Sequence, residues 1–356
     1  MPVAQDGPSA EEGVSVHDPI EALCLSQYGY WYPKLRRYAP KSTIINLDEL
    51  QPQFLEWFEE DGVVLSEAND LRGPQTKTRR DVNQEAREVL SDNDSDDSDS
   101  NKQPQFPELN ARIHDIIDKY GPVFPKLNWS APLDAAWILP GNTIRCQTPN
   151  DIYLLLKSSD FAVKDIEQVK ELQKECEIRG WAKPHVQLVL KKWFEMPRSH
   201  EFRAFVRDGR MIAISQRDIT FYEHLQDTST QERIQDQIYN MFNLVKEEVP
   251  LPDMAIDIYL TRNLDSGFVI DINPYLPRTD TFLWTFEELE ECAHTLLEAP
   301  HKAPLRVITS SAQASQSQPT YSFNMVPSDV VQIGSGQSIA EFASDWQKEL
   351  ATAIND

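Results

Sequence analysis

The sequence predicts a mixed α+β fold in which short strands and amphipathic helices follow one another along the chain. Apolar residues recur at helical spacing in several segments, and runs rich in β-branched residues separate them. The pair Asp208-Gly209 stands between two alternating runs, which is a strong hairpin signal. With 356 residues, the chain is long enough for one two-lobed unit or for two ordinary domains.

The N-terminal part predicts a strand followed by a helix. Residues 1–27 are expected to form a flexible N-terminus, because the start of the chain is polar and acidic. An aromatic cluster at 28–32 then leads into the strand-like run 42–45. Over 48–61 apolar residues recur at helical spacing, until Asp61-Gly62 ends the helix.

An acidic insertion is expected at 67–105, where the apolar content collapses. Residues 91–100 read SDNDSDDSDS. Because such a composition cannot bury enough apolar surface to offset the entropy of ordering, we expect this insertion to be disordered. Its serines are either phosphorylation sites or simply part of a solvated linker.

The remaining elements follow from hydrophobic periodicity and from turn residues. Gly121 follows an apolar stripe and Gly180 follows the charged run 163–179, and each is expected to end a helix. The predicted helices are 109–117, 150–156, 163–179, 234–245 and 285–298, and the predicted strands are 123–124, 186–193, 202–206, 211–215, 255–260 and 268–272. Residues 299–320 are rich in Ser, Gln and Pro and predict a linker. Within 321–356, an amphipathic helix containing Trp346 predicts a segment that docks on the body or on a partner.

Charge and composition exclude several classes of protein. The chain has 34 basic and 57 acidic residues and a net charge of −23, which disfavours nucleic acid as a partner. No signal peptide and no apolar run of about 20 residues is evident, so we expect a cytoplasmic protein that does not enter a membrane. The four cysteines are scattered without a CxxC pair, which indicates neither a zinc site nor a disulfide framework.

Three oxygen-bearing residues near the last predicted hairpin indicate a metal site. Side chains alternate along a strand, so Asp271 and Asn273 share one face while Ile270 and Ile272 are expected to face the core. If Asp257 lies opposite Asp271, the hairpin is centred on (257 + 271)/2 = 264, among turn-forming residues. Such oxygen ligands suit magnesium. The alternative is that the carboxylates simply face solvent.

Cationic residues that can meet phosphates lie on several predicted strands. Lys126 precedes a turn, 127–132, that is able to present backbone N–H groups to an anion. Lys191 and Lys192 are adjacent on a strand, so only one of them can face a pocket, and Arg203 and Arg217 lie on the next hairpin. Each of these cations alone is as well explained by an exposed ion pair.

Signatures of other nucleotide sites and of hydrolases are missing from the sequence. We find no GxxxxGK[ST] or GxGxxG, no HExxH, no GxSxG and no Cys-His signature. Catalytic residues are therefore not assigned.

Six segments together resemble one protein family. They are FPKLNWSAP at 124–132, LKSSDF at 156–161, LVLKKW at 188–193, EFR at 201–203, ISQRD at 214–218 and DINP at 271–274. The family is the eukaryotic cell-division-cycle family of ATP-grasp proteins, which help to assemble translation initiation factor two. Two departures are that Lys191 stands where the family often has arginine, and that Ile272 and Tyr275 stand where it commonly has phenylalanine.

The resemblance implies an ATP-grasp fold with ATP held between two α+β lobes. Residues 28–66 and 106–185 would form the N-terminal lobe and residues 186–298 the C-terminal lobe. Adenine would lie against the strand that ends at Trp193, and magnesium would bind Asp257, Asp271 and Asn273. The residues expected to hold ATP are Lys126, Trp129, Ser130, Ala131, Lys191, Lys192, Trp193, Arg203 and Arg217.

Two functions from different classes remain open at this point. The resemblance implies a non-enzymatic chaperone that binds ATP and Mg²⁺, captures the gamma subunit of the initiation factor, promotes assembly of its heterotrimer and supports translation initiation and the cell cycle. Such a protein is expected to be a monomer before it joins the complex. The alternative is an ATP-grasp ligase that activates a carboxylate as an acylphosphate.

Overall fold

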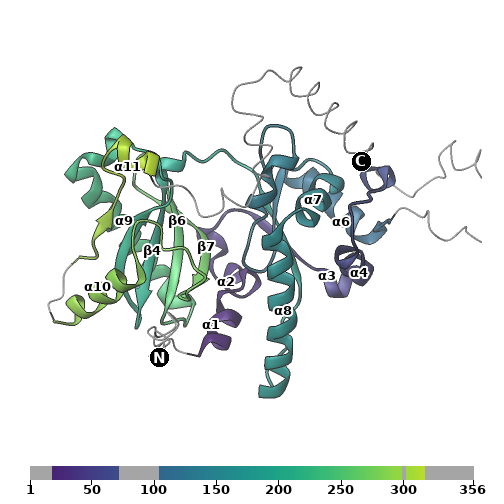
Figure 1. The fold of residues 1–356 in the computed structure, drawn as a ribbon, viewed down its shortest axis with the longest axis horizontal. Helices are drawn as coiled ribbons and strands as arrows, with labels where there is room; N and C mark the ends of the chain where they lie inside the picture. Colours follow the sequence, from purple (N-terminus) through teal and green to yellow (C-terminus); the bar gives the residue numbers. More distant parts are fainter. Residues whose placement is uncertain (1–17, 72–103, 299–301, 317–356) are drawn as a thin grey trace, which may run out of the picture.

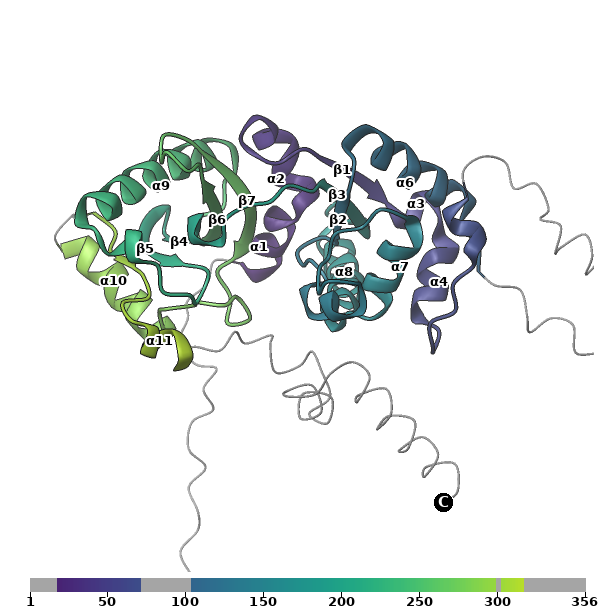
Figure 2. The same cartoon turned by 90° about the horizontal axis from the view of Figure 1, so that it is seen from above.

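The computed structural model describes residues 18–71, 104–298 and 302–316, and within them the predicted α+β class is confirmed. Two separate sheets, each with its own helices, form two lobes (Figures 1 and 2). Most of the predicted acidic insertion and the whole predicted C-terminal docking segment lie outside the described residues. In the described part of the chain, no helix combines the length and apolar character needed to span a membrane.

The N-terminal lobe is built on a three-stranded antiparallel sheet with the order β1-β3-β2. Its strands are β1 (Ser42–Asn46), β2 (Val123–Lys126) and β3 (Gln187–Lys192). The central strand β3 is buried on both faces, with Leu188 and Leu190 in one core cluster and Val189 in another, which explains its apolar run. The helices of this lobe are α3 (Leu47–Leu50), α4 (Pro52–Glu59), α6 (Pro107–Tyr120), α7 (Pro149–Lys157) and α8 (Asp160–Arg179). Gly180 has a left-handed backbone and ends α8, as predicted.

The C-terminal lobe contains a five-stranded sheet with the order β7-β6-β4-β5-β8. Its strands are β4 (Glu201–Arg207), β5 (Arg210–Gln216), β6 (Met254–Leu260), β7 (Gly267–Pro274) and β8 (Leu305–Arg306). Helix α9 (Thr228–Glu248) packs its apolar stripe on one face of the sheet. Helix α10 (Phe286–Glu298) covers the other face, where Leu289 joins a separate cluster. Strand β7, at one edge of this sheet, is the strand nearest the other lobe (Figure 1).

The turn between β4 and β5 has the conformation that its sequence predicts. Asp208 and Gly209 both have positive φ, 47° and 68°. A two-residue turn of this kind matches the right-handed twist of the flanking strands. The predicted hairpin is therefore confirmed.

The hairpin of β6 and β7 has the register that was predicted from its centre, with Asp257 opposite Asp271. The register then shifts between Asp257 and Ile258, because β7 contains one extra residue there. Ile272 is fully buried in the core, whereas Ile270 is only half-buried and lies outside it. The prediction that Ile270 faces the core is wrong, because a bulge interrupts the alternation of side chains.

Helices α1 (Pro19–Ser26) and α2 (Tyr28–Leu35) lie between the lobes in both views (Figures 1 and 2). Helix α1 falls within the range expected to be a flexible N-terminus, yet it is helical and capped by the Asp18 side chain. Its residue Ala22 belongs to the core of the C-terminal lobe, and Leu23 belongs to the core of the N-terminal lobe.

Part of the predicted linker 299–320 is also ordered. Strand β8 pairs in parallel with β5, and helix α11 (Ser311–Gln316) follows it. The sequence of β8 is only two residues long, which is too short to predict from periodicity.

Candidate functional site

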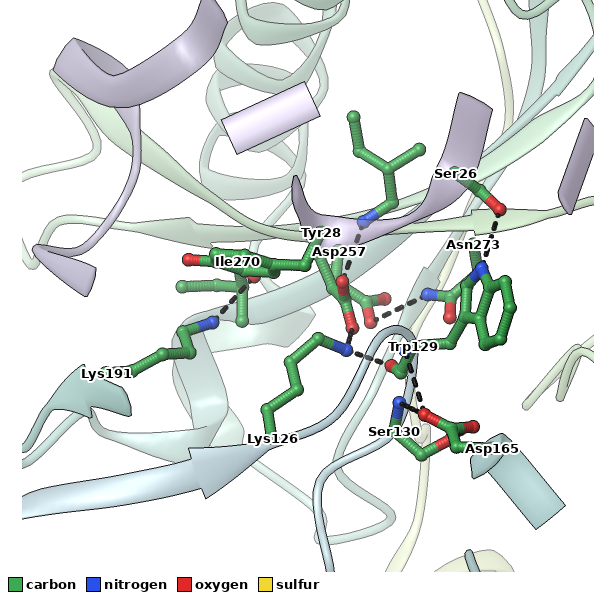
Figure 3. A network of polar contacts seen from close by, with 12 residues as sticks. Ser26, Tyr28, Lys126, Trp129, Ser130, Asp165, Lys191, Asp257, Ile270 and Asn273 are labelled. Carbon is green, nitrogen blue, oxygen red and sulfur yellow. Dashed lines mark hydrogen bonds and ion pairs between the residues drawn. The ribbon is translucent and has the colours of Figure 1, made fainter. Parts of the chain in front are cut away.

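The candidate site lies where β2 and β3 of one lobe face β6 and β7 of the other (Figure 3). Lys126, at the end of β2, reaches across the gap, and its Nζ lies 2.7 Å from Oδ2 of Asp271 on β7. The lysine side chain is 3% exposed and that of Asp271 is 17% exposed. Because water is largely excluded, this ion pair is less screened than a surface pair, and it joins the lobes directly.

Lys191 forms a second link between the lobes. Its Nζ donates a hydrogen bond to the carbonyl oxygen of Ile270 at 2.8 Å, at the bulge of β7. Burial lowers the pKa of the Lys191 amine to about 7, although nearby Asp271 opposes this effect. The amine also lies 5.0 Å from the centre of the Tyr28 ring. Its charge is therefore sensitive both to pH and to any anion that enters the site.

Lys192, the neighbour of Lys191, is not brought into the same cluster. Successive side chains of a strand leave opposite faces, and Lys192 is half-exposed. Of the two adjacent lysines, Lys191 is thus the one that faces the other lobe.

Asp257 on β6 is held by two arginines. Nε and Nη2 of Arg203 donate to its two carboxylate oxygens at 2.7 and 2.8 Å, which is a bidentate pair. Nε of Arg217 lies 3.4 Å from the same carboxylate, and its Nη1 donates to Glu201 at 2.7 Å. Burial raises the pKa of Asp257, but the two arginines more than offset it, so the pKa lies below its ordinary value.

Phe282 supports the two arginines from the loop after β7. The centre of its ring is 4.7 Å from the Arg203 guanidinium and 5.6 Å from that of Arg217. Its backbone has a φ of 53°, an uncommon conformation for a residue with a large side chain. Neither aromatic stacking on arginine nor a positive φ leaves a pattern in one sequence, so Phe282 is not among the residues predicted for the site.

The turn after β2 is organised by an acidic residue that is also absent from the residues predicted for the site. Asp165 on α8 accepts hydrogen bonds from the backbone N–H groups of Trp129 and Ser130, at 2.9 and 2.7 Å, and from Ser130 Oγ at 2.9 Å (Figure 3). These two N–H groups, which the sequence predicts to face an external anion, therefore bind the carboxylate of Asp165. The carbonyl oxygen of Trp129 in turn accepts a hydrogen bond from Nζ of Lys126. Asp165 consequently positions Lys126 through the turn.

Burial raises the pKa of Asp165, while the hydrogen bonds from the turn oppose that effect. A signal for Asp165 does exist in the sequence. The buried residues of α8 recur at helical spacing as Ala162, Ile166 and Val169, and Asp165 falls on the same stripe. An acid within an apolar stripe needs a buried partner.

The other predicted residues of the turn and of β3 have structural contacts. Trp129 donates from its indole Nε1 to Ser26 Oγ of α1 at 3.1 Å. Ala131 packs against the core of the N-terminal lobe. Trp193 is half-buried and makes an edge contact with Phe124, at 6.0 Å between ring centres. Contacts between the lobes are made by Lys126 and Lys191 on one side and by Asp271 and the Ile270 carbonyl on the other.

Asp257, Asp271 and Asn273 bring oxygen donors to adjacent strands, and in this structure the two carboxylates are paired with Arg203 and Lys126. Two carboxylates and an amide lie on adjacent strands, and Asn273 Nδ2 is 3.5 Å from Asp257 Oδ2. Oxygen donors of this kind suit magnesium, which takes one or two carboxylates and completes its shell with water or phosphate oxygens. Within the ranges that the structure describes, no three His, Cys, Asp or Glu side chains form a metal cluster, so the amide oxygen of Asn273 would be needed as the third ligand.

Known proteins resemble this chain over most of its length. It is 37% identical over 357 residues to a Kluyveromyces lactis protein named translation initiation factor eIF2 assembly protein, a match that covers 94% of this chain and 92% of that protein. It is 35% identical over 338 residues to cell division cycle protein 123 of Candida glabrata, with 91% and 90% covered.

A solved structure is similar as well. Cdc123 from Schizosaccharomyces pombe is 29% identical with a TM-score of 0.60, and the match covers 82% of this chain and 98% of that one. The D123 family pattern matches residues 31–334, which include both sheets and every predicted site residue. The chain therefore belongs to the D123 family.

Proposed function

We propose that this chain is an ATP- and magnesium-binding protein that promotes assembly of translation initiation factor eIF2, and that ATP binds between its lobes as in an ATP-grasp protein. The observation that carries the nucleotide site is the convergence of Lys126 and Lys191 from one lobe with Arg203, Asp257 and Asp271 from the other. The assembly role is supported by the relatives named eIF2 assembly protein.

Each group of residues in the proposed site has its own role. Lys126, Lys191, Arg203 and Arg217 would neutralise the phosphates, and adenine would lie against the end of β3 near Trp193. Trp129, Ser130 and Ala131 would shape the turn that positions Lys126. Asp257, Asp271 and Asn273 would hold Mg²⁺, which supplies charge neutralisation between the carboxylates and the phosphates when bound. Lys192 is left out of this proposal because its side chain leaves the opposite face of β3.

The proposed partner is the gamma subunit of eIF2, bound by a cytoplasmic protein that is a monomer until the complex forms. Because the phosphates would contact both lobes, ATP would hold the lobes in one relative arrangement, and the partner would bind that arrangement. We propose that the chain acts as a non-enzymatic chaperone. Release of ADP in the presence of a small acid and an amine, without any capture of the gamma subunit, would instead support a carboxylate ligase.

ATP together with Mg²⁺ is expected to bind and to raise the melting temperature of the full chain. A ligand that binds only the folded form stabilises it by RT ln(1 + [L]/Kd), about 2.7 kcal/mol at a hundredfold excess over Kd. Titration calorimetry with ATP, with and without Mg²⁺, measures the binding, and differential scanning measures the melting shift. Absence of binding heat from a folded sample would contradict the proposed site.

Affinity for ATP is expected to fall as the pH is raised from about 6.5 to about 8.5. The pKa of Lys191 is lowered to about 7, so the amine loses its charge over this range, and each pH unit above the pKa costs up to about tenfold if only the charged amine binds. The unliganded protein should show the opposite trend. An unfolded lysine binds more protons above pH 7 than buried Lys191 does, so this residue adds stability as the pH rises. Lys191→Met should flatten both profiles, and an unchanged pH profile in that variant would exclude Lys191 as the titrating group.

A further inference from the structure

Two thiols lie in contact at the boundary between α1 and α8. Sγ of Cys24 on α1 is 3.7 Å from Sγ of Cys176 on α8, although 152 positions separate them in the sequence. Cys176 is buried and Cys24 is half-buried, and both are free thiols. The two helices are also joined by an ion pair between Asp18 and Arg179, beside the thiols.

One thiol lies on the helix between the lobes, and the other lies on a helix of the N-terminal lobe. Helix α1 lies between the lobes, with Ala22 in the core of one and Leu23 in the core of the other. Helix α8 belongs to the N-terminal lobe and carries Asp165, which positions the turn at Trp129. A covalent bond between α1 and α8 would therefore fix the helix between the lobes to the lobe that contains Lys126.

We propose that Cys24 and Cys176 are a modification site, at which oxidation by a peroxide forms a disulfide that joins α1 to α8. The thiolate of Cys24, the more exposed of the two, attacks one oxygen of hydrogen peroxide, and the O–O bond breaks to give a sulfenic acid and hydroxide. The Cys176 sulfur then attacks the Cys24 sulfur, the S–S bond forms and water leaves. In total, two thiols lose two electrons and two protons, and one peroxide becomes two molecules of water.

Local chemistry predicts that this bond forms slowly at neutral pH. Burial and the neighbouring thiol raise the pKa of Cys24 to about 12, with Arg179 opposing and Asp18 reinforcing the effect. Since the thiolate is the nucleophile, the rate should rise about tenfold for each pH unit below that pKa. The contact between the sulfur atoms then favours capture of the sulfenic acid over further oxidation.

The test uses the full chain treated with hydrogen peroxide at about pH 7 and about pH 9, then digested without reductant. We expect a peptide linking Cys24 to Cys176, formed faster at the higher pH and lost on reduction with dithiothreitol. The oxidised chain should melt a few degrees higher, because the bond closes a long loop and restricts the unfolded state. A Cys146→Ser, Cys292→Ser double variant should retain the linked peptide and the melting shift, and Cys176→Ser should lose both.

Two outcomes would overturn the proposal. One is peroxide-treated protein in which Cys24 is oxidised to the sulfinic state with no linked peptide, because this would show that the sulfur atoms do not meet. The other is a melting shift of equal size in Cys176→Ser, which would assign the effect to a different modification. Neither result depends on whether the chain binds ATP.

Discussion

Replacing Asp271 with alanine should lower the affinity for ATP and Mg²⁺ by more than about 100-fold. Loss of even an outer partner of a metal ligand commonly costs about 10–100-fold, and Asp271 is proposed as a direct ligand. The same change removes the carboxylate that lies 2.7 Å from Nζ of Lys126, so the amine would also lose the partner that directs it toward β7. Titration calorimetry of the variant with ATP and Mg²⁺ measures the loss.

Two variants of the same hairpin make this result specific. Asp265→Ala removes an acidic side chain in the β6-β7 turn that bonds Thr261 and lies away from the site, and it should bind ATP normally. Asp271→Asn preserves the size of the side chain and an oxygen that can accept a hydrogen bond from Lys126, so it should fold as the native chain does and still bind poorly. Native affinity in both Asp271 variants, each shown to be folded by circular dichroism, would remove Asp271 from the proposed site.

The Asp271 variants also separate nucleotide binding from partner binding. If ATP fixes the arrangement of lobes that the partner recognises, Asp271→Ala should fail to capture the gamma subunit of eIF2. Capture by this variant at the native level would mean that the partner surface does not depend on the nucleotide. Partner binding and nucleotide binding would then be independent functions of the chain.

Contacts of the site between residues close in the sequence could be predicted, whereas contacts between distant segments could not. The pairing of Asp257 with Asp271 follows from a short turn and a two-residue period, both of which are local, and it is confirmed. The role of Asp165 depends on a helix placed 35 and 36 positions away from the turn that it holds. Single-sequence patterns carry no record of that placement, so the turn was interpreted as open to an external anion.

The boundary between the lobes was hard to predict for a similar reason. The start of the chain is polar, and α1 has only eight residues, so its periodicity is weak. Its order comes from being packed between two cores, through Ala22 on one side and Leu23 on the other. Tertiary contacts of this kind override local propensity. A helix that depends on packing between two lobes therefore cannot be predicted from its own residues.

The largest expected effect on stability comes from a substitution in β7, in the residues that follow its bulge. Ile272→Asp should destabilise the chain by more than about 4 kcal/mol, because Ile272 is fully buried and the new carboxylate would lie in an apolar core without a partner. Most domains have only about 5–15 kcal/mol of stability, so a loss of this size removes a large fraction of it. Urea denaturation followed by tryptophan fluorescence measures the change.

Ile270→Asp is the matched control, since it makes the same chemical change two positions away on the same strand. Strict alternation of side chains would place both residues in the core and would make the two variants equally damaging. The extra residue of β7 instead leaves Ile270 half-buried beside Lys191, whose Nζ reaches the carbonyl oxygen of Ile270 at 2.8 Å. A carboxylate there can remain solvated and can attract that amine, so the cost should be less than about 2 kcal/mol. Equal loss of stability in the two variants would show that Ile270 is a core residue and that the bulge does not set the face of this strand.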